Sequence, residues 1–435
     1  MRTCRVALLV LLLPTLVLVT AVARASTETV LYTFPADGSV GLHPYGALIS
    51  DASGSLYGTT WSGGNSGAGT VFRLTPSNGS YSFTLLYSFR GGKDGAFPYS
   101  RLAIDSAGNL YGTTFQGGGG TWCTQGRGGC GVVFKLTLSG GTYTETVIHA
   151  FKGGADGYHP HAGVALDPAG NIFGATYAGG SSACGVGGNY DDFGCGTIFK
   201  LSPSGSVYTK RTVYAFKGAG DGGNPWGDLL LDSSGNLYGT TRFGGDSYAC
   251  QYYGCGTVFR ISPSGGSGFK KALLYSFNQN PQLGNSIAAV VLDSDGNLYG
   301  TIGYVMFGFG GVFKLTPTPK GHWSFSLLYL FQAGADGSGP AAPLVRDGNG
   351  NLYGTTVSGG ICPASSAGCG TVFKLTPGNN ESFSESILYA FQGGPSDGQD
   401  PEAGLFMDQA GNLYGTSVLG GPCENGCGSV FKIAP

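Results

Sequence analysis

The residues most able to carry chemistry follow prolines that end glycine-rich loops. Arg101 and Asp228 each stand three residues after such a proline, where the other copies of the pattern have alanine, glycine or proline. His161 directly follows Pro160. Enzymes use such side chains to bind charge and to transfer protons. One hypothesis is therefore a polysaccharide lyase or hydrolase that uses these three residues. The alternative is that Arg101 and Asp228 form an ion pair that lines a channel, or are two solvated charges.

Aromatic residues gather in the same part of the chain. Six of them are candidates for ligand contact, and these are Tyr45, Trp61, Tyr99, Phe115, Tyr177 and Trp226. Aromatic rings present a large, rigid, apolar area at low entropic cost, which suits stacking against sugar rings or flat ligands. Packing of the rings against long loops would account for them without a ligand.

Cysteines follow a local pattern. Apart from Cys4 they fall in close pairs, which predicts the disulfides Cys123–Cys130, Cys184–Cys195, Cys250–Cys255, Cys362–Cys369 and Cys423–Cys427. Each disulfide would brace one glycine-rich loop whose ordering otherwise costs entropy. Metal binding is the rival interpretation, but the spacings vary and no histidine accompanies the pairs.

Other possible ligands for a metal are scattered. His43, His159 and His161 lie in glycine-rich loops, with no repeated carboxylate beside them. Aspartate recurs once per loop, at Asp37, Asp94, Asp156, Asp221, Asp336 and Asp397. A single carboxylate per loop indicates turn capping rather than a calcium cage. We therefore expect no metal and no cofactor.

These loops belong to a unit that recurs seven times. The segment Asn-Leu-Tyr-Gly-Thr-Thr, with small changes, places its aromatic residue at Tyr57, Tyr111, Phe173, Tyr238, Tyr299, Tyr353 and Tyr414. An apolar run ending in aspartate precedes it, and Gly-Thr-Val-Phe-Lys-Leu and Leu-Tyr-Ser-Phe follow it. Short segments rich in β-branched and aromatic residues, bounded by glycine or proline, predict strands. We call these four strands A, B, C and D.

Repetition of four-stranded antiparallel sheets around an axis produces a β-propeller. The sequence thus predicts an all-β, seven-bladed propeller over residues 26–435. The last unit ends after its C strand, and an unmatched D strand stands at the front, in residues 27–34. Pairing of the two would close the ring and remove its open edges.

The repeat resembles the GloVer-type tandem repeat of choice-of-anchor bacterial secreted proteins. The resemblance rests on Asp-x-x-Gly-Asn-Leu-Tyr-Gly-Thr-Thr followed by Gly-Thr-Val-Phe-Lys-Leu-Thr-Pro, and it spans nearly all of residues 26–435. It is specific as a repeat signature and implies no activity. Some members of that family carry a C-terminal sorting anchor, and we do not expect surface anchoring by that route here.

The N-terminus and the composition limit the location of the protein and its possible partners. A basic start, an apolar run to Val22 and the sequence Ala23-Arg24-Ala25 predict a signal peptide over residues 1–25, with a membrane anchor as the alternative. We expect a secreted, extracellular or periplasmic protein with no membrane contact after cleavage. The net charge of −2 and the lack of a basic tract give a nucleic-acid partner no electrostatic support.

Alternating strand directions place the loops between strands B and C, and those between strand D and the next strand A, on one face. Long, stapled loops belong more often to the functional side. We expect a non-catalytic binding or scaffold module on this face, with carbohydrate or a surface polymer as its ligand. The lyase or hydrolase and a structural protein of the cell envelope remain alternatives, since propellers host all three classes. A bare Arg101–Asp228 pair would favour a non-catalytic role, and a deep pocket joining them to His161 would favour an enzyme.

Overall fold

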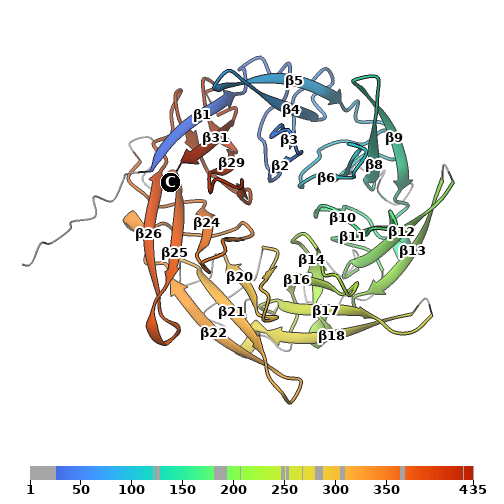
Figure 1. Ribbon diagram of the computed structural model, residues 1–435. Helices are drawn as coiled ribbons and strands as arrows, with labels where there is room; N and C mark the ends of the chain where they lie inside the picture. Colours follow the sequence, from blue (N-terminus) through green and yellow to red (C-terminus); the bar gives the residue numbers. More distant parts are fainter. Residues whose placement is uncertain are drawn as a thin grey trace, which may run out of the picture.

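Seven small antiparallel sheets surround one axis in the computed structural model (Figure 1). The all-β, seven-bladed propeller predicted from the sequence is confirmed. The structure describes residues 26–120, 123, 128–180, 194–205, 207–245, 250, 254–266, 268–279, 288–303, 309–362, 368–424 and 426–434. The predicted signal peptide, residues 1–25, lies outside this part of the chain.

Each blade contains the four strands A to D, in chain order in blades 1 to 6, while the D strand of blade 7 is the first strand of the chain. The innermost A strands have two residues each, and these are β2 (Ile49–Ser50), β6 (Ala103–Ile104), β10 (Ala165–Leu166), β15 (Leu230–Leu231), β19 (Val291–Leu292), β23 (Val345–Arg346) and β28 (Phe406–Met407). The B strands are β3 (Leu56–Thr60), β7 (Leu110–Thr114), β11 (Ile172–Thr176), β16 (Leu237–Phe243), β20 (Leu298–Ile302), β24 (Leu352–Thr356) and β29 (Leu413–Ser417).

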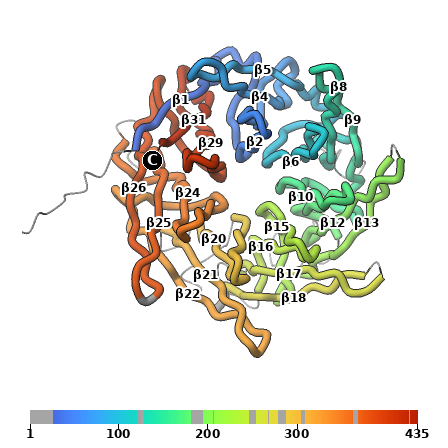
Figure 2. The backbone as a smooth tube through the Cα atoms, in the orientation of Figure 1, coloured from blue at the N-terminus to red at the C-terminus, as the bar shows by residue number. Residues whose placement is uncertain are grey.

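The outer two strands of each blade are longer. The C strands are β4 (Thr70–Ser77), β8 (Val132–Ser139), β12 (Thr197–Ser204), β17 (Thr257–Pro263), β21 (Gly311–Pro317), β25 (Thr371–Pro377) and β31 (Ser429–Ala434). The D strands are β5 (Ser80–Ser88), β9 (Thr142–Ala150), β13 (Val207–Ala215), β18 (Phe269–Ser276), β22 (Trp323–Leu330), β26 (Phe383–Ala390) and β1 (Thr27–Thr33). Figure 2 shows the backbone passing from the outer strand of one blade to the inner strand of the next.

Short elements lie in the loops between the strands. They are the strands β14 (Gly223–Pro225), β27 (Gly398–Gln399) and β30 (Leu419–Gly420), and the 3-10 turns η2 (Gly154–Asp156), η4 (Ala219–Asp221), η5 (Phe277–Gln279), η7 (Gly334–Asp336) and η8 (Asn379–Glu381). β14 pairs with β16, and β27 pairs with β30. These pairings fasten the loops that follow the D strands to the central part of the next blade.

The ring closes as predicted. β1 pairs antiparallel with β31, from Thr27 opposite Ala434 to Thr33 opposite Ser429. The first strand of the chain therefore completes the seventh blade, and β1 lies beside the C-terminus in Figure 1. This pairing covers the edge that β31 would otherwise expose.

One aromatic contact repeats at every junction between blades. The phenylalanine after each D strand packs edge-on against the phenylalanine in the C strand of the next blade, as Phe89 does against Phe134 at 5.1 Å between ring centroids. The other pairs are Phe34–Phe72, Phe151–Phe199, Phe216–Phe259, Phe277–Phe313, Phe331–Phe373 and Phe391–Phe431. All these rings are buried. Burial of each ring contributes about 1.5–3 kcal/mol, so this ring of contacts supplies much of the core.

The same phenylalanine explains a glycine of the repeat. A Cβ atom at Gly112 in β7 would lie 2.6 Å from Cζ of Phe134. Real Cβ atoms do not approach a ring that closely, so Leu-Tyr-Gly-Thr-Thr needs glycine where strand B crosses the phenylalanine of strand C. The equivalent contact, Gly58 with Phe72, recurs in the first blade.

The recurring motif of the A–B turn is explained by hydrogen bonds within the turn. Asp105 Oδ1 accepts hydrogen bonds from the backbone N–H groups of Ala107 and Asn109, at 3.0 and 2.9 Å. Its Oδ2 accepts from the Asn109 side chain and from the Tyr111 hydroxyl, at 2.8 and 2.9 Å. Gly108 takes a φ of 80° between them. The motif Asp-x-x-Gly-Asn-Leu-Tyr is thus a capped turn.

Four of the five predicted disulfides lie within the described residues and are confirmed. They are Cys123–Cys130, Cys250–Cys255, Cys362–Cys369 and Cys423–Cys427, with Cα–Cα distances of 5.2 to 5.4 Å. Cys195 is disulfide-bonded as well. Its predicted partner, Cys184, lies outside the described residues. Each bond closes a loop between strands B and C of one blade.

Candidate functional site

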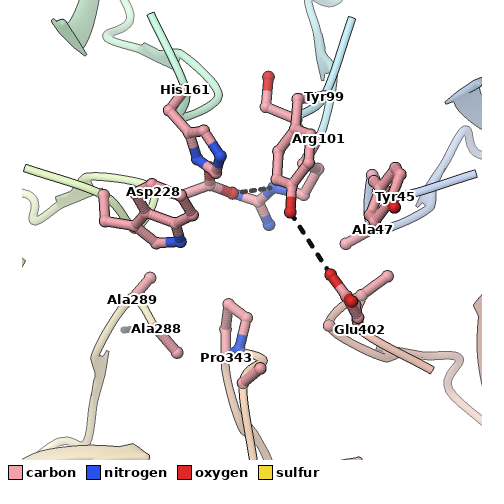
Figure 3. A pocket seen from close by; sticks show the side chains of 17 residues that line it. Tyr45, Ala47, Tyr99, Arg101, His161, Asp228, Ala288, Ala289, Pro343 and Glu402 are labelled. Carbon is pink, nitrogen blue, oxygen red and sulfur yellow. Dashed lines mark hydrogen bonds and ion pairs between the residues drawn. The ribbon is translucent and has the colours of Figure 1, made fainter. Parts of the chain in front are cut away.

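The loops that follow the D strands converge on a pocket at the centre of the ring (Figure 3). In six of the seven loops a proline fixes which residues reach it. Those directly after a proline are Tyr45, Tyr99, His161, Trp226, Ala341 and Glu402, and those three residues after it are Ala47, Arg101, Asp228, Pro343 and Gly404. Ala289 is the equivalent lining residue of blade 5, whose loop lacks the proline. Equivalent positions of the blades thus form two rings of side chains around the central axis.

The pocket is small. Its cavity volume is about 80 Å³, whereas pockets that enclose a whole small molecule measure about 300–1,000 Å³. It has room for a few waters or one polar group of a ligand. The structure joins Arg101, His161 and Asp228 at one pocket, as the enzyme hypothesis required, but the pocket is not deep.

Arg101 and Asp228 form an ion pair across the pocket. Nε of Arg101 lies 3.6 Å from Oδ2 of Asp228, and the two side chains are 49% and 21% exposed. Oδ1 of Asp228 accepts a 2.6 Å hydrogen bond from the backbone N–H of Gly163. A Cβ atom at Gly163 would lie 2.6 Å from the Arg101 carbonyl oxygen and 3.1 Å from Asp228 Oδ1. The small residue of blade 3 therefore makes room for charges from blades 2 and 4.

Four rings form an arc along one side of the pocket. Tyr45 stacks on Tyr99 at 4.8 Å between centroids, Tyr99 contacts His161 at 4.0 Å, and His161 contacts Trp226 at 3.5 Å. Tyr45, Tyr99 and Trp226 are partly exposed, and His161 is 7% exposed. We call Tyr45, Tyr99, His161 and Trp226 the aromatic arc.

A second row of aromatic residues supports the arc from behind. Trp61 meets Tyr99 edge-on at 5.6 Å and lies 5.9 Å from Phe115, and Tyr177 meets Trp226 edge-on at 5.5 Å. All three of these supporting rings remain partly exposed. All nine candidate ligand residues are thus gathered at one place. The aromatic ones pack on each other, as the packing interpretation expects, rather than standing out as separate platforms.

The structure adds two charged residues that were not among the predicted site residues. The hydroxyl of Tyr99 donates to Oε2 of Glu402 at 3.4 Å, as Figure 3 shows. The guanidinium of Arg242 lies 4.7 Å from the centroid of the Trp226 ring, a cation–π contact. Both residues could have been selected from the sequence, because each stands out at its position in the repeat. Glu402 is the acid directly after a loop proline, and Arg242 replaces the aromatic residue that follows strand B in blades 1 to 3.

Burial sets the protonation of the arc. Loss of solvent, aided by the positive charge of Arg242, lowers the pKa of His161 to about 3. Burial, and next the negative charge of Asp400, raise the pKa of Glu402, while the Tyr99 hydroxyl opposes this. His161 is therefore a neutral and weakly basic imidazole at neutral pH, which is a poor general base.

The other side of the pocket is apolar and small. Ala288, Ala289 and Pro343 lie opposite His161 and Tyr99 in Figure 3, and Ala341 and Gly404 also line the pocket. A ligand would meet the aromatic rings on one side only, while Glu402 lies next to the small residues in Figure 3. The pocket is therefore asymmetric although the fold repeats.

Within the described residues, no group of three or more histidine, cysteine, aspartate or glutamate side chains is placed to hold a metal ion. The aspartates of the loops cap turns. Asp94 Oδ2, for example, accepts from the Arg90 backbone N–H and from the Tyr87 hydroxyl, at 3.0 and 2.9 Å. No helix in the same part of the chain is long and apolar enough to pass through a membrane.

Fold and site together define a class, the seven-bladed β-propellers with a shallow pocket at the mouth of the central axis. Models of the Gloeobacter/Verrucomicrobia repeat match residues 17–192, 119–363 and 307–435. The chain belongs to this repeat family, as the resemblance in its sequence indicated. No protein with a curated description matches the sequence.

Solved structures share the fold. A proposed 6-phosphogluconolactonase from Bacteroides fragilis NCTC 9343 is 16% identical, with a TM-score of 0.53 over 89% of this chain and 99% of that one. Another, from Bacteroides uniformis ATCC 8492, is 15% identical, with a TM-score of 0.49 over 78% of this chain and 83% of that one. At this identity the likeness concerns the fold alone.

Proposed function

We propose that this protein is an exported, non-catalytic propeller that binds carbohydrate, or another surface polymer with sugar-like chemistry, at the aromatic arc. The observation that carries the proposal is the asymmetry of the central pocket. Seven copies of one unit would line the axis alike. Instead, Tyr45, Tyr99, His161 and Trp226 stand on one side, and alanine, proline and glycine stand on the other.

A sugar has the complementary surface. Its C–H faces pack on aromatic rings, and its hydroxyl groups exchange hydrogen bonds with charged side chains. Trp226 and Tyr99 offer ring surface, while Arg101, Asp228 and Glu402 offer donors and acceptors around the same pocket. Because the cavity is only about 80 Å³, we expect it to take one group of a sugar while the rest of the chain lies over the arc.

The electrostatics favour binding over catalysis. Arg101 and Asp228 compensate each other's charge, and Asp228 also accepts from the Gly163 N–H. His161, with a pKa near 3, is far from the neutral range in which a general base works best. The pair and the imidazole thus shape and polarise the pocket without supplying a proton acceptor.

The disulfides support export of the protein. Disulfides persist in oxidising compartments such as the periplasm and the cell exterior, and four close loops on the face that holds the pocket. We infer that residues 1–25 act as a signal peptide and that the mature chain is extracellular or periplasmic. Surface polymers are the partners available there.

A glycan array probed with purified residues 26–435 tests this function. Wild type is expected to bind a subset of glycans, and Trp61→Ala and Trp226→Ala are each expected to abolish or sharply weaken that binding. Phe309→Ala is the matched control, because Phe309 is an exposed aromatic residue, 44% exposed, that does not line the pocket. Failure of wild type to bind any glycan would overturn the proposal in favour of a structural role in the envelope.

A further inference from the structure

One position of each D strand faces a loop of the preceding blade, and its side chain differs from blade to blade. The position is fixed by register, because it pairs with the apolar residue that follows the basic residue of strand C. In β13 it is Lys210, opposite Leu201, and in β9 it is Glu145, opposite Leu136. The other occupants are Glu28, Phe83, Lys271, Phe325 and Glu385.

Two junctions are closed by lysine. Nζ of Lys210 lies 2.8 Å from Oδ1 of Asp156 and 2.7 Å from its backbone oxygen. Nζ of Lys271 lies 2.9 Å from Oδ1 of Asp221. The two lysine side chains are only 9% and 5% exposed. A buried ammonium thus joins the D strand of one blade to the aspartate of the loop that leaves the blade before it.

Two further junctions are closed by aromatic stacking. Phe83 stacks on Tyr32 at 4.3 Å, and Phe325 stacks on Tyr275 at 4.8 Å. The position therefore accepts either a cation that meets the loop aspartate or an apolar ring that meets the preceding D strand. Both arrangements leave the junction without an unmatched charge.

The remaining three junctions have neither a lysine nor an aromatic ring at this position. Glu145, Glu385 and Glu28 place a carboxyl group where lysine stands elsewhere, toward Asp94, Asp336 and Asp397. Oε1 of each glutamate is buried, and no described residue donates a hydrogen bond to it. Oδ1 of Asp336 is also buried without a described partner, although the equivalent atom of Asp156 accepts from lysine.

The loop aspartates cannot turn away to relieve this contact. Asp336 Oδ2 is held by the Gln332 backbone N–H at 2.9 Å and by the Tyr329 hydroxyl at 3.2 Å. Asp397 Oδ2 is held in the same way, by Gln392 at 2.7 Å and Tyr389 at 3.0 Å. Asp397 Oδ1 also accepts from the Gly398 backbone N–H, at 2.6 Å. What all three junctions lack is a hydrogen-bond donor to the buried Oε1 of the glutamate.

We propose that these three junctions are proton-dependent latches, in which a proton on one carboxyl of each pair supplies the donor that lysine supplies between blades 2, 3 and 4. Protonation lets one carboxyl donate a hydrogen bond and removes the repulsion between the pair. Loss of the protons leaves two facing carboxylates and weakens the contact between blades. The latches join blade 1 to 2, blade 5 to 6 and blade 6 to 7, so they are spread around the ring.

The electrostatic surroundings support this. Burial, and next the charge of the facing aspartate, raise the pKa of Glu28, Glu145 and Glu385 to about 7 in each case. The other titratable groups that face them are Arg90, which opposes the shift at Glu145, and the hydroxyls of Tyr87, Tyr329 and Tyr389.

The sign of the effect follows from the raised pKa. An unfolded glutamate loses its proton near pH 4.5, whereas the folded group holds it to about pH 7. The latch contribution is therefore complete below pH 4.5 and is lost progressively as the pH rises to 7. His161 acts in the opposite direction between pH 6.5 and 3, because its folded pKa is lowered. A comparison of variants at each pH separates the two.

Thermal unfolding from pH 4.5 to pH 8 of the triple variant Glu28→Gln, Glu145→Gln, Glu385→Gln tests the latches. Glutamine keeps the shape of a protonated glutamate and donates a hydrogen bond. We expect the variant's Tm to exceed that of wild type by an amount that grows up to pH 7 and reaches on the order of 3 °C at pH 8. Lys210→Gln is the matched control at an equivalent position. It should lower Tm by an amount that stays constant over this range.

Two results would overturn the proposal. One is a Tm difference between the triple variant and wild type that does not change with pH, because a packing effect alone would behave in this way. The other is a gain in Tm when millimolar Ca²⁺ is added to wild type at pH 8, reversed by EDTA and missing in the triple variant. That outcome would assign the unmatched oxygens to a metal ion instead of a proton.

Discussion

Arg101 and Asp228 pair across the central pocket although a whole blade separates them in the chain. Their Nε–Oδ2 distance is 3.6 Å, and Gly163 of the intervening blade donates its N–H to the same aspartate. The two departures from the repeat are therefore one feature, made possible by the small residue between them. This pairing lets the pocket hold an arginine and an aspartate whose charges compensate each other.

Gly163 should not tolerate even a methyl group. In Gly163→Ala the new Cβ would meet the Arg101 carbonyl and Asp228 Oδ1 at 2.6 and 3.1 Å. Overpacking of this kind costs about 1–3 kcal/mol, so we expect a lower free energy of unfolding in urea. Gly348→Ala is the control, since a Cβ there meets nothing within 4 Å. Equal stability of the two variants would mean that the Arg101–Asp228 pair does not need this space.

His161 should remain neutral through the physiological range. Burial lowers its pKa to about 3, so its contribution to stability is complete above pH 6.5 and falls as the pH drops toward 3. In NMR spectra of ¹⁵N-histidine-labelled protein, the signals lost in His161→Gln should not shift between pH 8 and pH 5. The urea-unfolded chain, whose histidines titrate near pH 6.5, gives the reference. A midpoint near pH 6.5 for His161 in the folded protein would restore it as a possible general base.

The disulfides should prove local when mapped in the oxidised protein. Peptide mapping without reduction is expected to recover Cys123 with Cys130, Cys250 with Cys255, Cys362 with Cys369, and Cys423 with Cys427. Closure of loops of this length stabilises by about 2–3 kcal/mol each in the chain-entropy description. The double variant Cys123→Ser, Cys130→Ser should therefore have a lower Tm than wild type. Peptides that link different blades would contradict the structure.

Removal of the N-terminal strand should open the ring. Deletion of residues 26–34 takes away β1, the partner of β31, and Phe34, which packs against Phe72 of blade 1. The exposed β31 edge is expected to pair with other chains, so the deletion variant should aggregate. Light scattering of the two proteins at equal concentration measures this. A monomeric deletion variant with wild-type Tm would show that closure adds little.

The sequence was enough to predict the blades, their closure and the residues that reach the axis. Each of these depends on a local pattern that recurs, such as the capped turn at Asp105 or the proline before Tyr99. The contact between Gly112 and Phe134 is equally local, because it joins neighbouring strands of one blade. Repetition also exposes departures, and this is how Arg101 and Asp228 could be selected before the fold was known.

Contacts between distant blades could not be predicted. Tyr99 and Glu402 are 303 positions apart and meet only because the ring closes. The partial burial of Trp61 and Phe115 depends on how neighbouring loops pack, which no single unit encodes. The Glu145 and Lys210 junctions were missed for a similar reason. The role of these two residues depends on how a D strand lies against a loop from another blade.

The central claim is that the aromatic arc binds carbohydrate, and a comparison of dissociation constants tests it most directly. Isothermal titration of the best array glycan would be done with wild type, Trp226→Ala and Phe309→Ala. Loss of ring stacking should cost about 1–2 kcal/mol, so Trp226→Ala is predicted to weaken binding about five- to thirtyfold, with Phe309→Ala unchanged. Equal affinities for all three proteins would contradict the account and move the ligand site away from the arc.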